Sequence, residues 1–191
     1  MFKIDISMST LLYFGAIALL EGKHFLSLAF AVFIHEAGHI LCAKLLKIKI
    51  NRMFLSPLGA RIEIDDNIPY FNELMLSLAG PVFGILGCGF GLALSHLSIN
   101  ASGFAFISLA LSLFNLLPLA TLDGGRVIFC LCALVFDLEF AERFLRILTF
   151  LTLFAIWLFS AYIMIKFAWG LSAFVFCTIF FLKCFVFKVE N

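Results

Sequence analysis

The stretch FLSLAFAVFIHEAGHILCAKLL, residues 25–46, decides the class of fold because it places polar groups inside an apolar segment of membrane-spanning length. A helix crosses the hydrocarbon of a bilayer in about 20 apolar residues. His35 lies about ten residues into the segment, which is about 15 Å at a rise of about 1.5 Å per residue and is close to the midplane. Two histidines and a glutamate cost several kcal/mol at that depth unless they are paired, bind a metal or face water. We therefore expect a compensating partner for His35, Glu36 and His39.

The composition of the whole chain also indicates that a bilayer surrounds it. The 191 residues are 64% hydrophobic and 13% charged, and the mean hydropathy is +1.15. A soluble domain could not cover its surface with so little polar material. Because the formal charge is +1, no basic face is expected, and DNA and RNA are not expected as partners. The six cysteines lie in apolar runs without a C-x-x-C pair, so they predict neither a disulfide framework nor a thiolate zinc site.

Charged or glycine-rich breaks divide the chain into six candidate spans, which predicts an all-α polytopic membrane protein. The spans cover residues 6–20, 25–46, 71–97, 103–136, 147–165 and 169–187. The fourth span is too long for one straight helix, and we expect it to break near Pro118 and the pair Gly124 and Gly125. Irregular backbone at membrane depth survives only against protein or water. Lys and Arg gather on the loops that share a side with both termini, so the positive-inside rule places both termini in the cytosol.

The segment 47–66, between the second and third spans, differs from the rest of the chain. Isoleucines alternate with polar residues on both sides of a Ser-Pro-Leu-Gly turn signal at 56–59. This pattern predicts a β-hairpin. Two interpretations of the hairpin remain open: a solvated cytosolic loop, or an edge that pairs with an extended peptide by strand addition.

The spacing of His35 and His39 predicts a metal site. On a helix, residues at i and i+4 share one face, so both imidazoles can bind one ion. In such sites two neutral His nitrogens and a third ligand hold zinc, and the fourth position takes water whose pKa falls toward about 7. Glu36 lies beside the pair and can take a proton from that water and return it to the leaving amine. The alternative is a hydrogen-bonded polar cluster that holds helices together.

The third ligand is predicted within NLLPLATLDGGR, residues 115–126, where Asp123 is an isolated carboxylate in apolar sequence. The glycines that follow it let the backbone turn toward a metal held by another helix, and Arg126 is expected to buffer local charge. Without the first motif the segment would be interpreted as a helix-breaking cap. Asn115, two turns earlier, is expected either to hold a substrate backbone or oxyanion, or to make an interhelical hydrogen bond. Ala79-Gly80-Pro81 in the third span is expected to be structural, allowing close helix approach and a kink.

Taken together, these residues resemble the site-2 protease class of intramembrane zinc metalloproteases, peptidase family M50. The signatures of this class are an H-E-x-x-H span and a later N-x-x-P-x-x-x-L-D-G segment, and both are present. FLSPLGARIEI at 54–64 and the Ala-Gly-Pro at 79–81 look like its stage IV sporulation protein FB branch.

The resemblance implies a role for each candidate residue. His35, His39 and Asp123 would bind one Zn²⁺ per chain, and Glu36 would activate water. Asn115 and the hairpin would help to present the substrate. Whether iron or cobalt replaces zinc in the cell stays open.

The resemblance also implies a biological setting. It places the protein in the membrane surrounding the forespore of a bacterial endospore former, where it cleaves a membrane-associated sigma factor precursor and meets membrane-protein regulators. Thr121 stands where close relatives often have proline, and the chain ends soon after the sixth span without a CBS domain. We therefore expect a single intramembrane metalloprotease domain over residues 1–191.

Two other functions remain open. An ion or proton transporter could use the buried His and Asp residues, although no pairing of inverted halves is visible in the sequence. A non-catalytic scaffold could bind and retain clients, although the usual mark of such a protein is the loss of a ligand or of the glutamate, and all of these are present.

Overall fold

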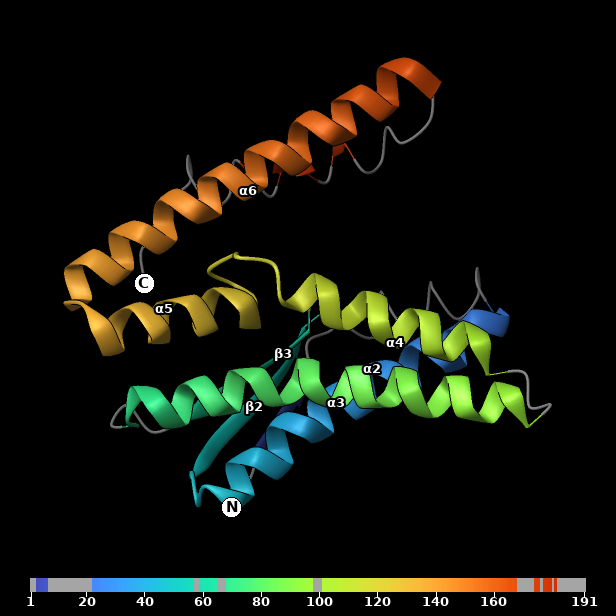
Figure 1. The fold of residues 1–191 in the computed structure, drawn as a ribbon, viewed down its shortest axis with the longest axis horizontal. Coiled ribbons are helices and arrows are strands. Elements are labelled where there is room, and N and C mark those ends of the chain that lie inside the picture. Colours follow the sequence, from blue (N-terminus) through green and yellow to red (C-terminus); the bar gives the residue numbers. More distant parts are fainter. Residues whose placement is uncertain are drawn as a thin grey trace.

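The computed structural model describes residues 3–6, 22–56, 59–64, 68–97, 101–167, 174–175, 177–179 and 181. The long helices of this part are α2 (Gly22–Leu45), α3 (Tyr70–His96), α4 (Ser102–Asn115), α5 (Asp123–Val135) and α6 (Leu138–Phe167). α2, α3 and α4 pack against one another, α5 packs on α3, and α6 runs away from this group (Figure 1). The core therefore lies around α3, which contacts α2, α4 and α5.

Three of the described helices are long and apolar enough to cross a membrane. These segments are Phe25–Leu45, Tyr70–His96 and Leu138–Lys166. They correspond to the second, third and fifth predicted spans. Residues 7–20 of the predicted first span and most of the predicted sixth span, 169–187, lie outside the described residues.

The long fourth span is broken, as the sequence predicts. α4 has 14 residues and is therefore about 21 Å long, less than the hydrocarbon thickness of about 30 Å. Residues 116–122, which include Pro118, link it to α5. Side chains at Gly124 and Gly125 would overlap the backbone of this link, so the two glycines allow it to fold over the first turn of α5.

Small residues set the distance between α3 and α4. Glycines recur on the buried face of α3 at spacings of four and three residues: Gly80, Gly84, Gly87 and Gly91. The Ser108 hydroxyl of α4 donates a hydrogen bond to the Gly84 carbonyl at 2.9 Å. A Cβ at Gly91 would lie 2.9 Å from the Cβ of Ala105. The two helices thus approach closely through small residues, as is common in membrane helix packing.

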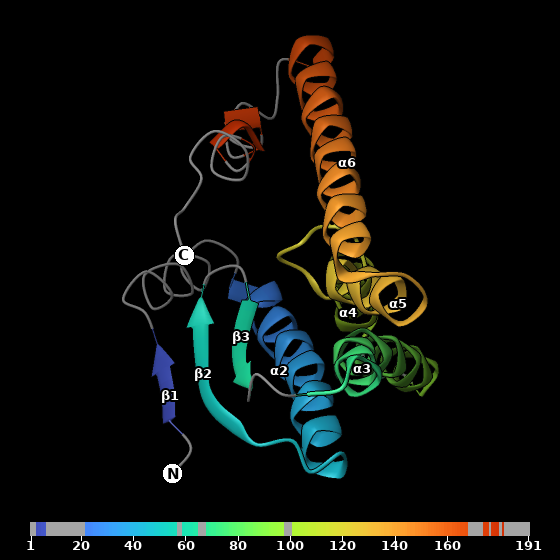
Figure 2. The same cartoon turned by 90° about the vertical axis from the view of Figure 1, so that its left-hand side faces the viewer.

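A three-stranded sheet lies beside α2 (Figure 2). β2 (Ile50–Ser56) and β3 (Gly59–Ile64) pair antiparallel, within the segment where the sequence predicts a hairpin. β1 (Lys3–Ile6) pairs parallel with β2, so β2 is the central strand. The sequence does not predict β1, and the expected start of the first span at Ile6 is instead the last residue of this strand.

Candidate metal centre

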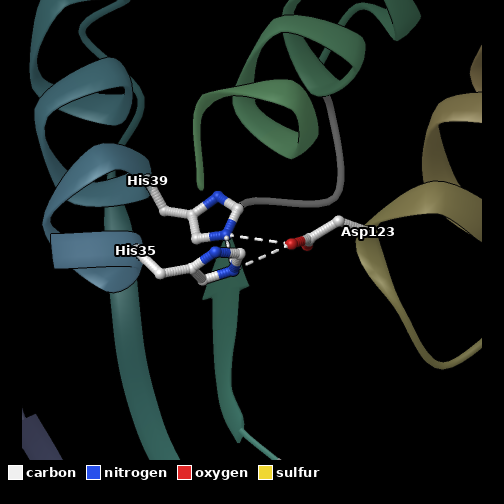
Figure 3. Close-up of side chains that lie close together, drawn as sticks. All are labelled: His35, His39 and Asp123. Atoms are coloured by element: carbon white, nitrogen blue, oxygen red, sulfur yellow. Dashed lines mark hydrogen bonds and ion pairs between the residues drawn. The ribbon is translucent and has the colours of Figure 1, made fainter. Parts of the chain in front are cut away.

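The structure brings His35 and His39 of α2 together with Asp123 of α5 (Figure 3). Asp123 Oδ2 lies 3.1 Å from His35 Nε2 and 3.3 Å from His39 Nε2. The two Nε2 atoms are 3.3 Å apart. The three atoms therefore form a nearly equilateral triangle that joins two helices from distant parts of the sequence.

The size of this triangle fits a zinc ion. Zinc is bound by His nitrogen and carboxylate oxygen at about 2.0–2.2 Å, usually in tetrahedral geometry. The edge of such a tetrahedron is about 3.3–3.5 Å, close to the separations between the three donor atoms. Three protein ligands leave one vertex of the tetrahedron for water or substrate, which is the pattern of catalytic rather than structural zinc.

Burial makes the three side chains depend on a partner. The exposed fraction of the side chain is 4% for His35, 9% for His39 and 19% for Asp123. Asp123 is the first residue of α5, where the partial positive charge of a helix N-terminus favours a carboxylate. A divalent cation at the triangle would compensate the carboxylate and use the lone pairs of both rings.

A hydrogen bond from α3 prepares His39 for this role. His39 Nδ1 lies 2.8 Å from the backbone carbonyl oxygen of Leu76. Because a carbonyl can only accept, Nδ1 carries the proton, and Nε2 of the neutral ring presents its lone pair to the triangle. Metal-binding histidines commonly have their second nitrogen fixed in this way.

The other predicted residues have different surroundings. Glu36 is half-buried on α2, one residue after His35. The Asn115 side-chain amide donates a hydrogen bond to the Leu111 carbonyl of its own helix at 3.0 Å, so this hydrogen bond is neither interhelical nor directed at the triangle. Arg126 Nη1 lies 3.8 Å from Glu73 Oε1, so Arg126 forms its ion pair with Glu73 of α3 and not with Asp123.

Two positions in α3 that contact the centre were not assigned to it from the sequence. Leu76 acts through its carbonyl, for which side-chain patterns give no signal. Gly80, interpreted from sequence only as a helix-packing residue, faces both imidazoles: a Cβ there would overlap His39 Nε2 and lie 2.8 Å from His35 Nε2. The sequence signal for Gly80 was a residue without a side chain in the Ala-Gly-Pro triplet, which indicates close packing but not which group packs there.

The sequence profile of peptidase family M50 matches residues 23–103 and 92–159 of the chain, including His35, His39 and Asp123. The chain belongs to peptidase family M50. This M50 chain is 33% identical over 137 residues to stage IV sporulation protein FB of Bacillus subtilis (strain 168), covering 68% of the chain and 48% of that protein. It is 33% identical over 111 residues to a zinc metalloprotease of Methanocaldococcus jannaschii, and this match covers 54% of the chain and 32% of that protein. The chain thus spans about half or less of the length of these relatives.

The fold of the M50 chain is also found in a solved structure, the site-2 protease from Methanocaldococcus jannaschii. The TM-score is 0.70 at 23% identity, and the match covers 95% of this chain and 88% of the other. The predicted resemblance to the site-2 protease class is therefore confirmed for family and fold.

Proposed function

We propose that this chain is a membrane-embedded zinc endopeptidase that hydrolyses peptide bonds of membrane-associated proteins. The observation that carries the proposal is the triangle of His35 Nε2, His39 Nε2 and Asp123 Oδ2 between α2 and α5. Membership of a metalloprotease family supports the same chemistry.

One Zn²⁺ per chain would be held by His35, His39 and Asp123. When bound, zinc supplies a Lewis acid that polarises a carbonyl group and lowers the pKa of water toward about 7. The α2 backbone sets both imidazoles on one helix face, and the Leu76 carbonyl orients the His39 ring. The chain's own contribution is thus a preorganised set of ligands with one open vertex.

Glu36 is proposed as the general base and acid. Its carboxylate accepts a proton from the attacking water and later delivers it to the nitrogen of the leaving amine. Its place next to His35 on α2 supports this role, because the carboxylate and the ligand pair belong to the same turns of this helix. We further propose that Asn115 and the β2–β3 hairpin help to present an extended substrate.

The membrane topology is proposed to be six spans with both termini in the cytosol, in a single domain over residues 1–191. Three helices of spanning length and the broken α4–α5 segment support four of these spans. The distribution of Lys and Arg supports the orientation.

The substrate is proposed to be a membrane-associated sigma factor precursor, processed in the membrane surrounding a forespore with control by membrane-protein regulators. Support for the sporulation role comes from the similarity to stage IV sporulation protein FB. The proposed hydrolytic centre does not depend on the identity of this substrate.

The proposal is tested by co-expressing the chain with membrane-tethered precursor proteins and separating the products by size. Glu36→Gln is expected to slow cleavage by about 10²–10⁴-fold, because the amide cannot accept the proton. Its zinc content should match the unsubstituted chain, since no ligand is removed. Glu139→Gln, the same change at an exposed position of α6, is the control and should cleave normally. Cleavage by Glu36→Gln at the full rate would contradict the assignment.

A further inference from the structure

We infer that α3, which supplies no ligand, forms a wall of the metal centre through Gly80, and that the missing side chain at this position is a condition of metal binding. The inference rests on the proposed zinc site. Gly80 is assigned as a positioning residue, because it acts on the two imidazoles and not on the substrate.

Gly80 leaves open a space beside the two imidazole rings that a side chain would fill. A Cβ built there would overlap His39 Nε2 and would lie 2.6 Å from His39 Cε1 and 2.8 Å from His35 Nε2. Real Cβ atoms essentially never approach other heavy atoms this closely. Because these two nitrogens also face Asp123, even a methyl group at this position would enter the space around the donor atoms.

The His39 ring has little freedom to rotate away from position 80. The Leu76 carbonyl oxygen, one turn before Gly80 on the same face of α3, accepts a hydrogen bond from His39 Nδ1 at an N···O distance of 2.8 Å. Rotation of the ring away from a Cβ would break this buried hydrogen bond. The bond that orients the donor therefore also holds it against Gly80.

α2 and α3 cannot move apart near the centre without losing close contacts. A Cβ at Gly38, between the two histidines, would lie 2.6 Å from the Ala79 carbonyl oxygen and 2.8 Å from Phe83 Cβ. The two helices are thus in close contact beside the centre. A methyl group at Gly80 should therefore displace the rings, so that their lone pairs no longer converge.

The expected result of Gly80→Ala is a loss of zinc affinity of about 10- to 100-fold, the size seen when residues that orient metal ligands are changed. The full chain is purified in detergent, stripped with a chelator and titrated with Zn²⁺ and with Co²⁺, whose visible absorption reports ligand geometry. Gly89→Ala is the matched control, because it lies on the same helix and its Cβ would meet nothing within 4 Å. It should bind both metals as the unsubstituted chain does.

A double-mutant cycle separates the clash from a general loss of packing. Thermal unfolding of the metal-free protein is compared for Gly80→Ala, His39→Ala and the double variant. If the clash is with the ring, removing the ring should relieve most of the destabilisation by Gly80→Ala. Fully additive destabilisation would overturn the inference, and this readout remains valid when Gly80→Ala alone binds no metal.

The outcomes distinguish this inference from the proposed function. Zinc binding by Gly80→Ala with unchanged affinity and an unchanged Co²⁺ spectrum would overturn the inference while leaving the proposed site intact. Failure of the unsubstituted chain and of Gly89→Ala to bind zinc would overturn the proposed site, and the inference with it.

Discussion

α3 and α6 are both long apolar helices, but they are built for different surroundings. Within the membrane-spanning stretch of each helix, 44% of α3 is buried inside the protein and only 17% of α6. Both helices expose large apolar side chains, such as Phe90 on α3 and Phe154 on α6, but α3 also presents buried glycines to its neighbours and a carbonyl to His39. The difference teaches that hydropathy alone does not locate the functional core of a membrane protein. The size of the buried residues does so better.

The largest effect should come from the ligand that joins the core to α5. Asp123→Ala is expected to reduce zinc content to a small fraction and to abolish the proposed proteolysis, because it removes one of the three proposed ligands. Asp137→Ala is the control: its Oδ1 accepts the Phe140 amide at 2.7 Å at the start of α6. Loss of this cap should cost about 1 kcal/mol of stability and no zinc. Normal zinc content in Asp123→Ala, measured by metal analysis, would indicate another third ligand.

The next largest effect should be a difference in stability when side chains are enlarged in α3 and in α6. Gly84→Val inserts three carbons where even a Cβ would overlap Ser112 Oγ, and overpacking of this kind typically costs about 1–3 kcal/mol. Ala155→Leu adds the same number of carbons at an exposed position of α6 and should be nearly neutral. Thermal unfolding in one detergent measures both. Equal destabilisation would remove the distinction between the helices.

A smaller effect is expected where α6 touches the core. Thr149 Oγ1 accepts the Ala120 amide at 3.2 Å and lies 3.5 Å from the Pro118 carbonyl oxygen, so it connects α6 to the link before Asp123. Thr149→Val should cost about 1 kcal/mol, the usual net value of one hydrogen bond, and should weaken zinc binding less than Asp123→Ala. Thr152→Val, at a half-buried position one turn away, is the control. If both variants lose zinc equally, the hydrogen bond has no special role.

The smallest effect should come from the ion pair of Glu73 and Arg126. Its charged atoms are 3.8 Å apart, and the Arg126 side chain is 42% exposed. Such pairs contribute about 0–1 kcal/mol. A double-mutant cycle with Glu73→Gln and Arg126→Gln, followed by thermal unfolding, measures the coupling between them. A coupling well above 1 kcal/mol would show that the pair anchors α5 on α3.

The sequence predicts the parts of this molecule that depend on side-chain type. The i, i+4 histidines and an isolated carboxylate in apolar sequence were sufficient to predict the cluster of His35, His39 and Asp123, and Pro118 marks the break before α5. The contribution of Leu76 was not predictable, because a backbone carbonyl carries no side-chain identity. β1 was missed because a four-residue strand depends on a partner far along the chain. The first and sixth spans stay predictions.

His35 and Asp123 lie 88 positions apart in the sequence, and this separation constrains when the centre can exist. A nascent chain that ends before Asp123 contains both imidazoles but not the carboxylate that completes the triangle. α3 and α4 are therefore synthesised before the proposed ligand set is complete. Zinc binding by all three proposed ligands is therefore possible only after residue 123 has been synthesised and α5 has packed on α3.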